Sequence, residues 1–236
     1  MHFEQLNQSG WAKTYLLVDS DTQMAALVDP VYDFMNEYLA LIETRNLSLH
    51  YAIATHTHAD HISACSSLRE RTGCEYVMWK DTACLKVSKY LQEGEALMLG
   101  STPLKIHHVP GHTNDHVLIE GPSHLLTGDF LFTGQGGVGR DDLPSGELFS
   151  HWESLKKLEQ LDGTLLVCTG HEAPGTIMQT LAWNRTNNPV LKMTTFEQFE
   201  TWQKKVTANL GSVSKINTAL PANLFAEIPD VIPWME

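Results

Sequence analysis

Short apolar segments alternate with amphipathic segments along most of the chain. Residues 14–18 and 24–28 are almost entirely apolar and flank a polar turn at 19–21, a pattern typical of two strands joined by a hairpin. Residues 33–43 carry apolar side chains at helical spacing instead, and residues 51–54 form another short apolar run. The first quarter of the chain therefore predicts strands and helices in alternation.

The same alternation continues to the last third of the sequence. Strands are predicted at 104–109, 117–119, 124–127 and 165–168, and helices at about 62–71, 148–161, 176–183 and 196–206. The end of the chain contains Pro221, Pro229 and Pro233 and is expected to be irregular. Because no linker or low-complexity stretch interrupts the pattern, we expect one α/β domain over residues 1–236, with the segment from about 190 packed on it.

Composition and charge narrow the classes of partner. Hydrophobic residues make up 42% of the 236 and charged residues 19%, which is typical of a folded globular protein. Lys and Arg number 16 against 28 Asp and Glu, a formal charge of −12. We therefore expect no nucleic acid and no anionic membrane as a partner, since both require a basic surface. Without a visible signal peptide, an apolar stretch of about 18 residues or a CxxC pair, we expect a cytoplasmic protein with reduced cysteines.

Histidine is the residue type that stands out. The chain contains 12, nine of them between His50 and His124. Four side chains of metal-ligand type follow the predicted strand 51–54 directly, as His56-x-His58-x-Asp60-His61. Imidazole and carboxylate together suit zinc, iron or manganese. The alternative is a polar loop whose Asp60 caps the next helix, a role that is compatible with metal binding.

Three more candidate ligands each lie just after the end of a predicted strand. His112, Asp129 and His171 each follow a predicted strand, and each is preceded by glycine. Any one of them alone would be an ordinary loop residue. Strand ends present side chains to a common edge, and glycine lets the backbone bend sharply there. Together with the first motif they predict a metal centre, with His116 close enough in sequence to be its neighbour.

The ordered set of seven ligand-type residues resembles that of the metallo-β-lactamase superfamily. This resemblance implies a four-layer αββα sandwich with a metal site at one edge. Four further stretches resemble persulfide dioxygenases, also called sulfur dioxygenases, so that the similarity extends over nearly the whole chain. These stretches are Thr14–Leu17 with Ala26–Val31, Gly139–Asp142, Arg185–Pro189 and Pro221–Asn223.

The resemblance to persulfide dioxygenases implies one Fe(II) per chain, held by His56, His112 and Asp129. This two-His, one-carboxylate triad leaves open positions for a sulfur ligand and dioxygen. The implied reaction oxidises a thiol persulfide, such as glutathione persulfide, to sulfite and free thiol. The remaining candidates would surround the iron and orient its ligands; they are His58, Asp60, His61 and His171.

Glyoxalase-II-type thioester hydrolases share the same ligand set and remain the alternative. They imply two Zn ions or a mixed Zn/Fe pair bridged by Asp129. One metal would be bound by His56, His58 and His112, and the other by Asp60, His61 and His171. Two departures from the dioxygenase pattern keep this alternative open: Ala173 stands where Tyr is usual, and Val138 where Cys is frequent.

Two predictions concern residues outside the ligand set. Arg140 has the planar fork that binds a substrate carboxylate well, but an ion pair with Asp141 or Asp142 is an equal alternative. The aromatic side chains of Phe225 and Trp234 near the end of the sequence suggest a surface for a second subunit. A homodimer is therefore one candidate assembly.

Overall fold

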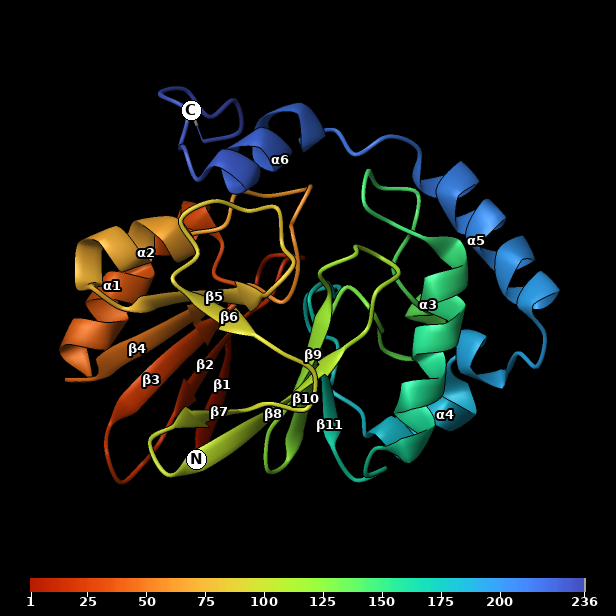
Figure 1. Cartoon of the computed structure of the whole chain (residues 1–236), viewed down its shortest axis with the longest axis horizontal. Helices are drawn as coiled ribbons and strands as arrows, with labels where there is room; N and C mark the ends of the chain where they lie inside the picture. The colour runs from red at the N-terminus through yellow and green to blue at the C-terminus, as the bar shows by residue number, and fades with distance from the viewer. Residues whose placement is uncertain (236) are drawn as a thin grey trace.

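Two β-sheets pack face to face between outer helices (Figure 1). The computed structural model describes residues 1–235. The first sheet has the order β1-β2-β3-β4-β5-β6, formed by His2–Leu6, Thr14–Val18, Met24–Val28, Ser48–Ile53, Glu75–Trp79 and Lys89–Leu91. The second has the order β11-β10-β9-β8-β7, formed by Leu166–Thr169, His124–Gly128, Val117–Glu120, Thr102–His108 and Ala96–Leu99.

Helices cover the outer face of each sheet. Helices α1 (Met35–Thr44) and α2 (Cys65–Thr72) lie on the side of the first sheet, and α3 (Leu148–Leu155), α4 (Leu181–Asn187) and α5 (Phe196–Leu210) on the side of the second (Figure 1). Helix α6 (Ile216–Phe225) crosses one end of the sandwich. Short 3-10 segments occupy Tyr32–Phe34, Gly134–Gly136, Lys156–Gln160 and Val190–Lys192. The predicted four-layer αββα arrangement is therefore confirmed.

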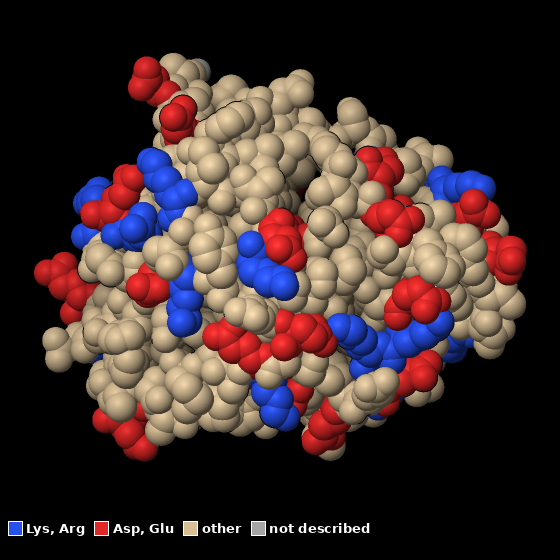
Figure 2. Space-filling model, viewed as in Figure 1, with Lys and Arg blue, Asp and Glu red and all other residues tan. Residues whose placement is uncertain are grey.

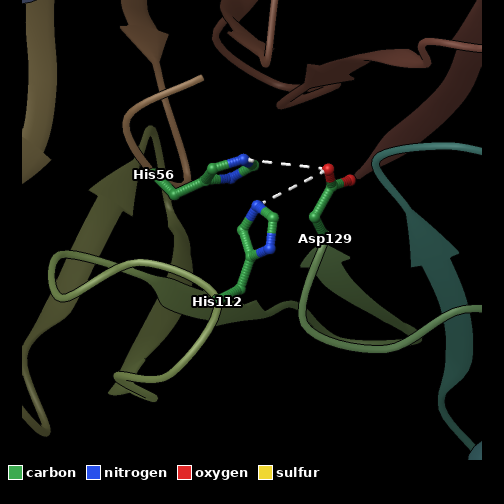
Figure 3. Close-up of side chains that lie close together, drawn as sticks. All are labelled: His56, His112 and Asp129. Carbon is green, nitrogen blue, oxygen red and sulfur yellow. Dashed lines mark ion pairs between the residues drawn. The ribbon is translucent and has the colours of Figure 1, made fainter. Parts of the chain in front are cut away.

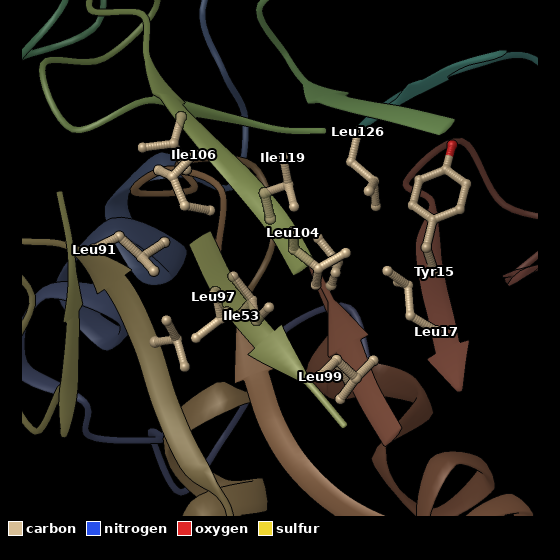
Figure 4. Packing of buried hydrophobic residues seen from close by; sticks show 14 of the residues in the cluster. Tyr15, Leu17, Ile53, Leu91, Leu97, Leu99, Leu104, Ile106, Ile119 and Leu126 are labelled. Atoms are coloured by element: carbon tan, nitrogen blue, oxygen red, sulfur yellow. The ribbon is translucent and has the colours of Figure 1, made fainter. Parts of the chain in front are cut away.

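The apolar strands are buried on both faces, which explains why they contain so few polar residues. Tyr15 and Leu17 of β2 point between the sheets, while Leu16 and Val18 point toward the helices. The layer between the sheets is filled by leucine and isoleucine side chains from both sides (Figure 4). Fully burying one such side chain contributes about 1.5–3 kcal/mol. This layer holds the strand ends that carry the site.

The last part of the chain packs on the rest through small apolar contacts. Phe199 of α5 is fully buried in the core on the outer face of the second sheet. Ala219 and Ala222 of α6 form a separate buried cluster with Ile62 and Ile232. Helix α6 therefore contacts the segment that directly follows the first histidine motif.

Two sequence expectations in this region are wrong. The helix predicted at 176–183 begins only at Leu181, because Gln179 and Thr180 run alongside β11: the N–H of Val167 donates to the Gln179 carbonyl at 2.9 Å. The irregular end is also contradicted, since α6 is a helix with Pro221 inside it. Burial of its alanines and the bonds of Asn223 described below offset the lost backbone hydrogen bond.

Other boundaries differ by smaller amounts. The predicted helix 148–161 changes to a 3-10 turn at Lys156, and the helix predicted from Ile62 begins at Cys65. The helix predicted to 206 continues to Leu210, where Gly211 ends it with a φ of 64°. No helix within residues 1–235 is long and apolar enough to cross a membrane. Figure 2 shows acidic and basic side chains in small mixed clusters on the face viewed.

Candidate metal centre

Three buried side chains from three different loops converge at one edge of the sandwich (Figure 3). The Nε2 atoms of His56 and His112 lie 4.0 and 3.8 Å from Oδ2 of Asp129. One ligand atom from each of the three side chains falls within 4.8 Å of the others. A single ion can therefore contact all three, and two imidazoles with one carboxylate are a donor set that Fe(II) accepts.

Hydrogen bonds to the other ring nitrogens orient these histidines. The Nδ1 atom of His112 lies 2.5 Å from the carbonyl oxygen of Arg140 and donates to it, so Nε2 is the atom left for a ligand. Nδ1 of His56 lies 3.0 Å from the hydroxyl of Thr55. Thr55 is itself fixed by Asp29, which accepts its N–H at 2.7 Å and its hydroxyl at 2.8 Å. Such outer partners set the tautomer and the direction of a metal-binding imidazole.

Glycines bring Asp129 into the same place. Asp129 directly follows β10, where Gly128 has a φ of +48°, a conformation that few other residues adopt. Gly170 is required for a different reason: its N–H donates to the Gly128 carbonyl at 2.6 Å, and a Cβ there would collide with Oδ1 of Asp129. Gly128 thus allows the bend before Asp129, and Gly170 leaves room for the Asp129 carboxylate.

The remaining predicted ligands lie beside this group. His58, Asp60 and His61 form a second cluster, and Asp60, Asp129 and His171 form a third that links the two. His171 bridges the carboxylates: its Nδ1 is 2.7 Å from Asp129 and its Nε2 is 2.8 Å from Asp60. The structure therefore brings all seven predicted residues together, and their role as ligands stays a prediction.

Two unpartnered ring nitrogens test whether these residues fit a metal. Nδ1 of His58 and Nε2 of His61 are buried without a hydrogen-bond partner among the described residues. The opposite nitrogen of each ring is engaged, by Asp29 at 3.2 Å and by Asp60 at 3.1 Å. Because an unsatisfied buried polar atom is costly, a free nitrogen on each of two clustered imidazoles fits ligation of a cation.

In the metal-free chain, the electrostatics of the cluster favour the metal-binding forms of His56 and Asp129 but the protonated form of His171. Burial, followed by the neighbouring His58, holds the pKa of His56 well below its usual value, so its imidazole is neutral and able to bind a metal. Burial alone would raise the pKa of Asp129, but His171 and His112 outweigh it and lower that pKa to about 2. Burial likewise opposes the charge on His171, yet Asp129 and Asp60 raise its pKa well above the ordinary value.

Two further residues contact the predicted ligands: Asp29, which the sequence analysis did not predict, and His116, which it did. Asp29, which supports Thr55 and His58, was not singled out, although it follows a strand end as the other acidic candidates do. His116 is fully buried, its ring stacks on that of His56 at 4.6 Å, and its Nε2 accepts the N–H of Asp129 at 3.2 Å. The neighbour role expected for His116 thus agrees with its position.

A cavity of about 530 Å³ opens directly over the cluster. Asp60, His112, Asp129 and His171 line its floor. Arg140 also lines it, with its guanidinium paired to Asp142 at 2.6 and 2.7 Å. The ion pair that the sequence allowed is therefore present, and carboxylate binding by Arg140 stays a prediction.

A two-sheet αββα sandwich with clustered His and Asp at one edge defines a class of metal-binding enzymes. Residues 11–171 match the family model described as the Metallo-beta-lactamase superfamily. The chain therefore belongs to this superfamily, as its ligand pattern predicted.

Similar proteins of two kinds occur within the superfamily. Mouse (Mus musculus) mitochondrial persulfide dioxygenase ETHE1 is 32% identical over 215 residues, which cover 89% of this chain and 82% of the mouse protein. The hydroxyacylglutathione hydrolase GloC of Haemophilus influenzae is 30% identical and covers 81% of this chain and 98% of its own. The crystal structure of ETHE1 from Myxococcus xanthus superposes with a TM-score of 0.88 at 30% identity, over 96% of this chain and 99% of that one.

Proposed function

We propose that the chain is an iron-dependent persulfide dioxygenase. It would oxidise a thiol persulfide, such as glutathione persulfide, with dioxygen and water to sulfite and the free thiol. The observation that carries this proposal is the similarity to ETHE1 proteins over nearly the whole chain, in sequence and in fold. A second support is the compact group formed by His56, His112 and Asp129. Residues 1–236 are proposed to act as one domain.

The proposed residues have distinct tasks. His56, His112 and Asp129 would hold one Fe(II), which when bound supplies open positions for sulfur and dioxygen and the redox chemistry between them. The carbonyl of Arg140 keeps Nδ1 of His112 protonated and Nε2 directed at the site. His171 holds a proton between Asp60 and Asp129 and thereby fixes both carboxylates.

The cavity above the centre would hold the substrate and exclude water from it. Trp11, Phe132 and Leu143 contribute apolar surface to its walls, so that a bound substrate would displace water from the floor. The reaction RSSH + O2 + H2O → RSH + SO3²⁻ + 2H⁺ oxidises the outer sulfur and releases the carrier thiol. Reconstitution of the metal-free chain with Fe(II), followed by assay of sulfite from glutathione persulfide, tests the proposal. A chain with one iron that forms no sulfite would refute it.

A second function is supported by a specific observation. In the two-metal arrangement, the free Nδ1 of His58 would join His56 and His112 at one metal. The free Nε2 of His61 would join Asp60 and His171 at the other. Two Zn ions or a Zn/Fe pair would then suit a thioester hydrolase acting on acyl-glutathione. Such an enzyme would work under nitrogen, whereas the dioxygenase would not. Metal analysis with an anaerobic thioester assay separates the two.

A further inference from the structure

One buried carboxylate close to the site has no part in the proposed reaction. Asp115 lies three positions after His112, in the loop between β8 and β9, and its side chain is buried. A carboxylate is costly to bury unless hydrogen bonds satisfy its oxygens. The donors that satisfy Asp115 therefore indicate which segments this residue holds together.

Four donors from three segments reach the Asp115 carboxylate. Oδ1 accepts the N–H of Thr57 at 3.1 Å and the hydroxyl of Thr113 at 2.8 Å. Oδ2 accepts the hydroxyl of Thr57 at 2.6 Å and that of Thr82 at 2.7 Å. All four distances lie within the ordinary range of hydrogen bonds. Asp115 thus joins its own loop to the loop after β4 and to the segment between β5 and β6.

The two loops that meet at Asp115 carry the two histidines of the proposed iron centre. Thr57 directly follows His56, and Thr113 directly follows His112. The two imidazole rings stand edge to face, with their centroids 4.9 Å apart. A shift of one loop against the other would change this separation. The link through Asp115 therefore bears directly on whether one ion can contact both rings.

Few other hydrogen bonds join these two loops. Both loops lack helix and strand where they meet, and among the described residues one further hydrogen bond connects them, from the N–H of Val117 to the Thr55 carbonyl at 2.9 Å. Thr82 anchors Asp115 from outside the two loops. Its own hydroxyl oxygen accepts the N–H of Cys84, a buried residue, at 3.2 Å. Asp115 is therefore held in place while it holds the loops.

We propose that Asp115 is a positioning residue for the metal centre, which keeps His56 and His112 at the separation that one ion requires. The inference rests on the proposed metal site, but not on the reaction performed there. Asp115 belongs to none of the three candidate ligand groups among the described residues, so it would act through Thr57 and Thr113. Loss of partners beyond the ligands commonly weakens metal binding by roughly ten- to a hundredfold.

The variant Asp115→Ala tests this role with Co(II) added to the metal-free protein. It is expected to bind Co(II) about tenfold more weakly than wild type. Its visible absorption spectrum at saturating Co(II) should also differ from that of wild type, because the imidazole ligands shift. A residue that only stabilises the fold would leave the spectrum of the folded protein unchanged. Affinity and spectrum equal to those of wild type would overturn the proposal.

Asp19→Ala is the matched control. Asp19 is another carboxylate that joins two turns, because it accepts hydrogen bonds from Thr22 and from Ser101. It directly follows β2, which runs antiparallel to β3, whereas β4 runs parallel to β3. Asp19 therefore lies at the edge of the sheet opposite the site. Both alanine variants should unfold at a lower urea concentration, but the same spectral change in Asp19→Ala would contradict a specific role for Asp115.

Asp115→Asn separates the geometry of the link from its charge. Both donors to Oδ2 are hydroxyls, which can accept as well as donate. A carboxamide can therefore keep all four contacts, with its oxygen in place of Oδ1 and its NH2 group in place of Oδ2. A positioning role predicts a spectrum like that of wild type and a Co(II) affinity within about threefold of it. An affinity as low as that of Asp115→Ala would contradict positioning and assign the effect to charge.

Thr57→Val provides the same test if Asp115→Ala does not fold. It removes the 2.6 Å hydrogen bond to Asp115 and keeps the shape of the side chain. Co(II) binding is expected to be about threefold weaker, with a smaller change of the spectrum. An unchanged affinity and spectrum would overturn the proposal.

Sulfite assays of the Fe(II) enzyme distinguish this inference from the proposed function. If wild type forms no sulfite but Asp115→Ala changes the Co(II) spectrum and Asp19→Ala does not, the reaction is wrong and the role of Asp115 stands. If wild type forms sulfite and Asp115→Ala forms it equally fast with an unchanged spectrum, the reaction stands and the role of Asp115 is wrong.

Discussion

The side-chain amide of Asn223 donates to the backbone carbonyl of His61 across 162 positions of sequence, at 2.9 Å. The same Nδ2 donates to the carbonyl of His58 at 2.9 Å, and Oδ1 accepts the N–H of Ser63 at 2.8 Å. The loop after β4 has no regular structure there, so its backbone groups need such partners. Helix α6 thereby fixes the loop that carries four of the predicted ligands.

Replacing Asn223 should weaken metal binding. Asn223→Ala removes all three bonds and is expected to cost about 1–3 kcal/mol of unfolding free energy. Freed movement of His58 and His61 should also weaken Co(II) binding about tenfold, as loss of outer partners commonly does. Titration of the metal-free protein with Co(II), followed by visible absorption, measures the affinity. Asn217→Ala on an exposed position of α6 is the control, and equal affinity in both variants would contradict the role of Asn223.

Substitution of Gly170 should displace Asp129. In Gly170→Ala the new Cβ would overlap Oδ1 of Asp129 and the backbone of Gly128, so the carboxylate or the strand end must move. We expect loss of stability of about 1–3 kcal/mol, as for other overpacked sites, together with reduced iron content. Thermal unfolding and metal analysis measure the two effects. Gly10→Ala, whose Cβ would lie 3.7 Å or more from its neighbours, should leave iron content near that of wild type.

Removal of the Asp129 carboxylate should abolish the metal centre. Asp129 contacts the groups of both candidate metals, through His56 and His112 on one side and His171 on the other. Asp129→Ala is therefore expected to lose bound metal and activity under either proposed function. Metal content after reconstitution and sulfite formation are the measurements. Activity surviving at the wild-type level would show that the site lies elsewhere.

Asp19 should make stability depend on pH. The backbone N–H and hydroxyl of Thr22, with Ser101 of the turn between β7 and β8, hold the pKa of Asp19 well below its usual value. A lowered folded-state pKa adds stability that is complete near neutral pH and is lost as the pH falls below about 5. Asp19→Asn should therefore be less stable than wild type at neutral pH, with a difference that shrinks on acidification. Urea unfolding across this range measures the difference, and one that grew on acidification would refute the assignment.

Much of the architecture follows from patterns that are local in sequence. The strands 14–18 and 24–28 were predicted within their observed bounds, because both of their faces are buried and apolar runs report that directly. The positions of His56, His112, Asp129 and His171 after strands were enough to predict that they meet. These predictions succeed because each rests on a pattern within a few residues, either an apolar run or a ligand placed directly after a strand.

The misses come from contacts between distant segments. The sequence around Pro221 indicates a break, but α6 forms because it packs on Ile62 and binds the ligand loop through Asn223. The helix expected from 176 is displaced because Gln179 extends along β11. For Arg140 the pattern offered two partners, and the choice of Asp142 appears only in three dimensions. Local propensity carries no information about these partners.

Oxygen consumption by the Fe(II)-reconstituted chain tests the central claim most directly. With a thiol persulfide in an oxygen electrode, the dioxygenase predicts one O2 consumed per sulfite formed, one iron per chain, and no uptake by Asp129→Ala. Two metals per chain, no oxygen uptake, and anaerobic cleavage of acyl-glutathione would contradict that claim and identify the thioester hydrolase instead.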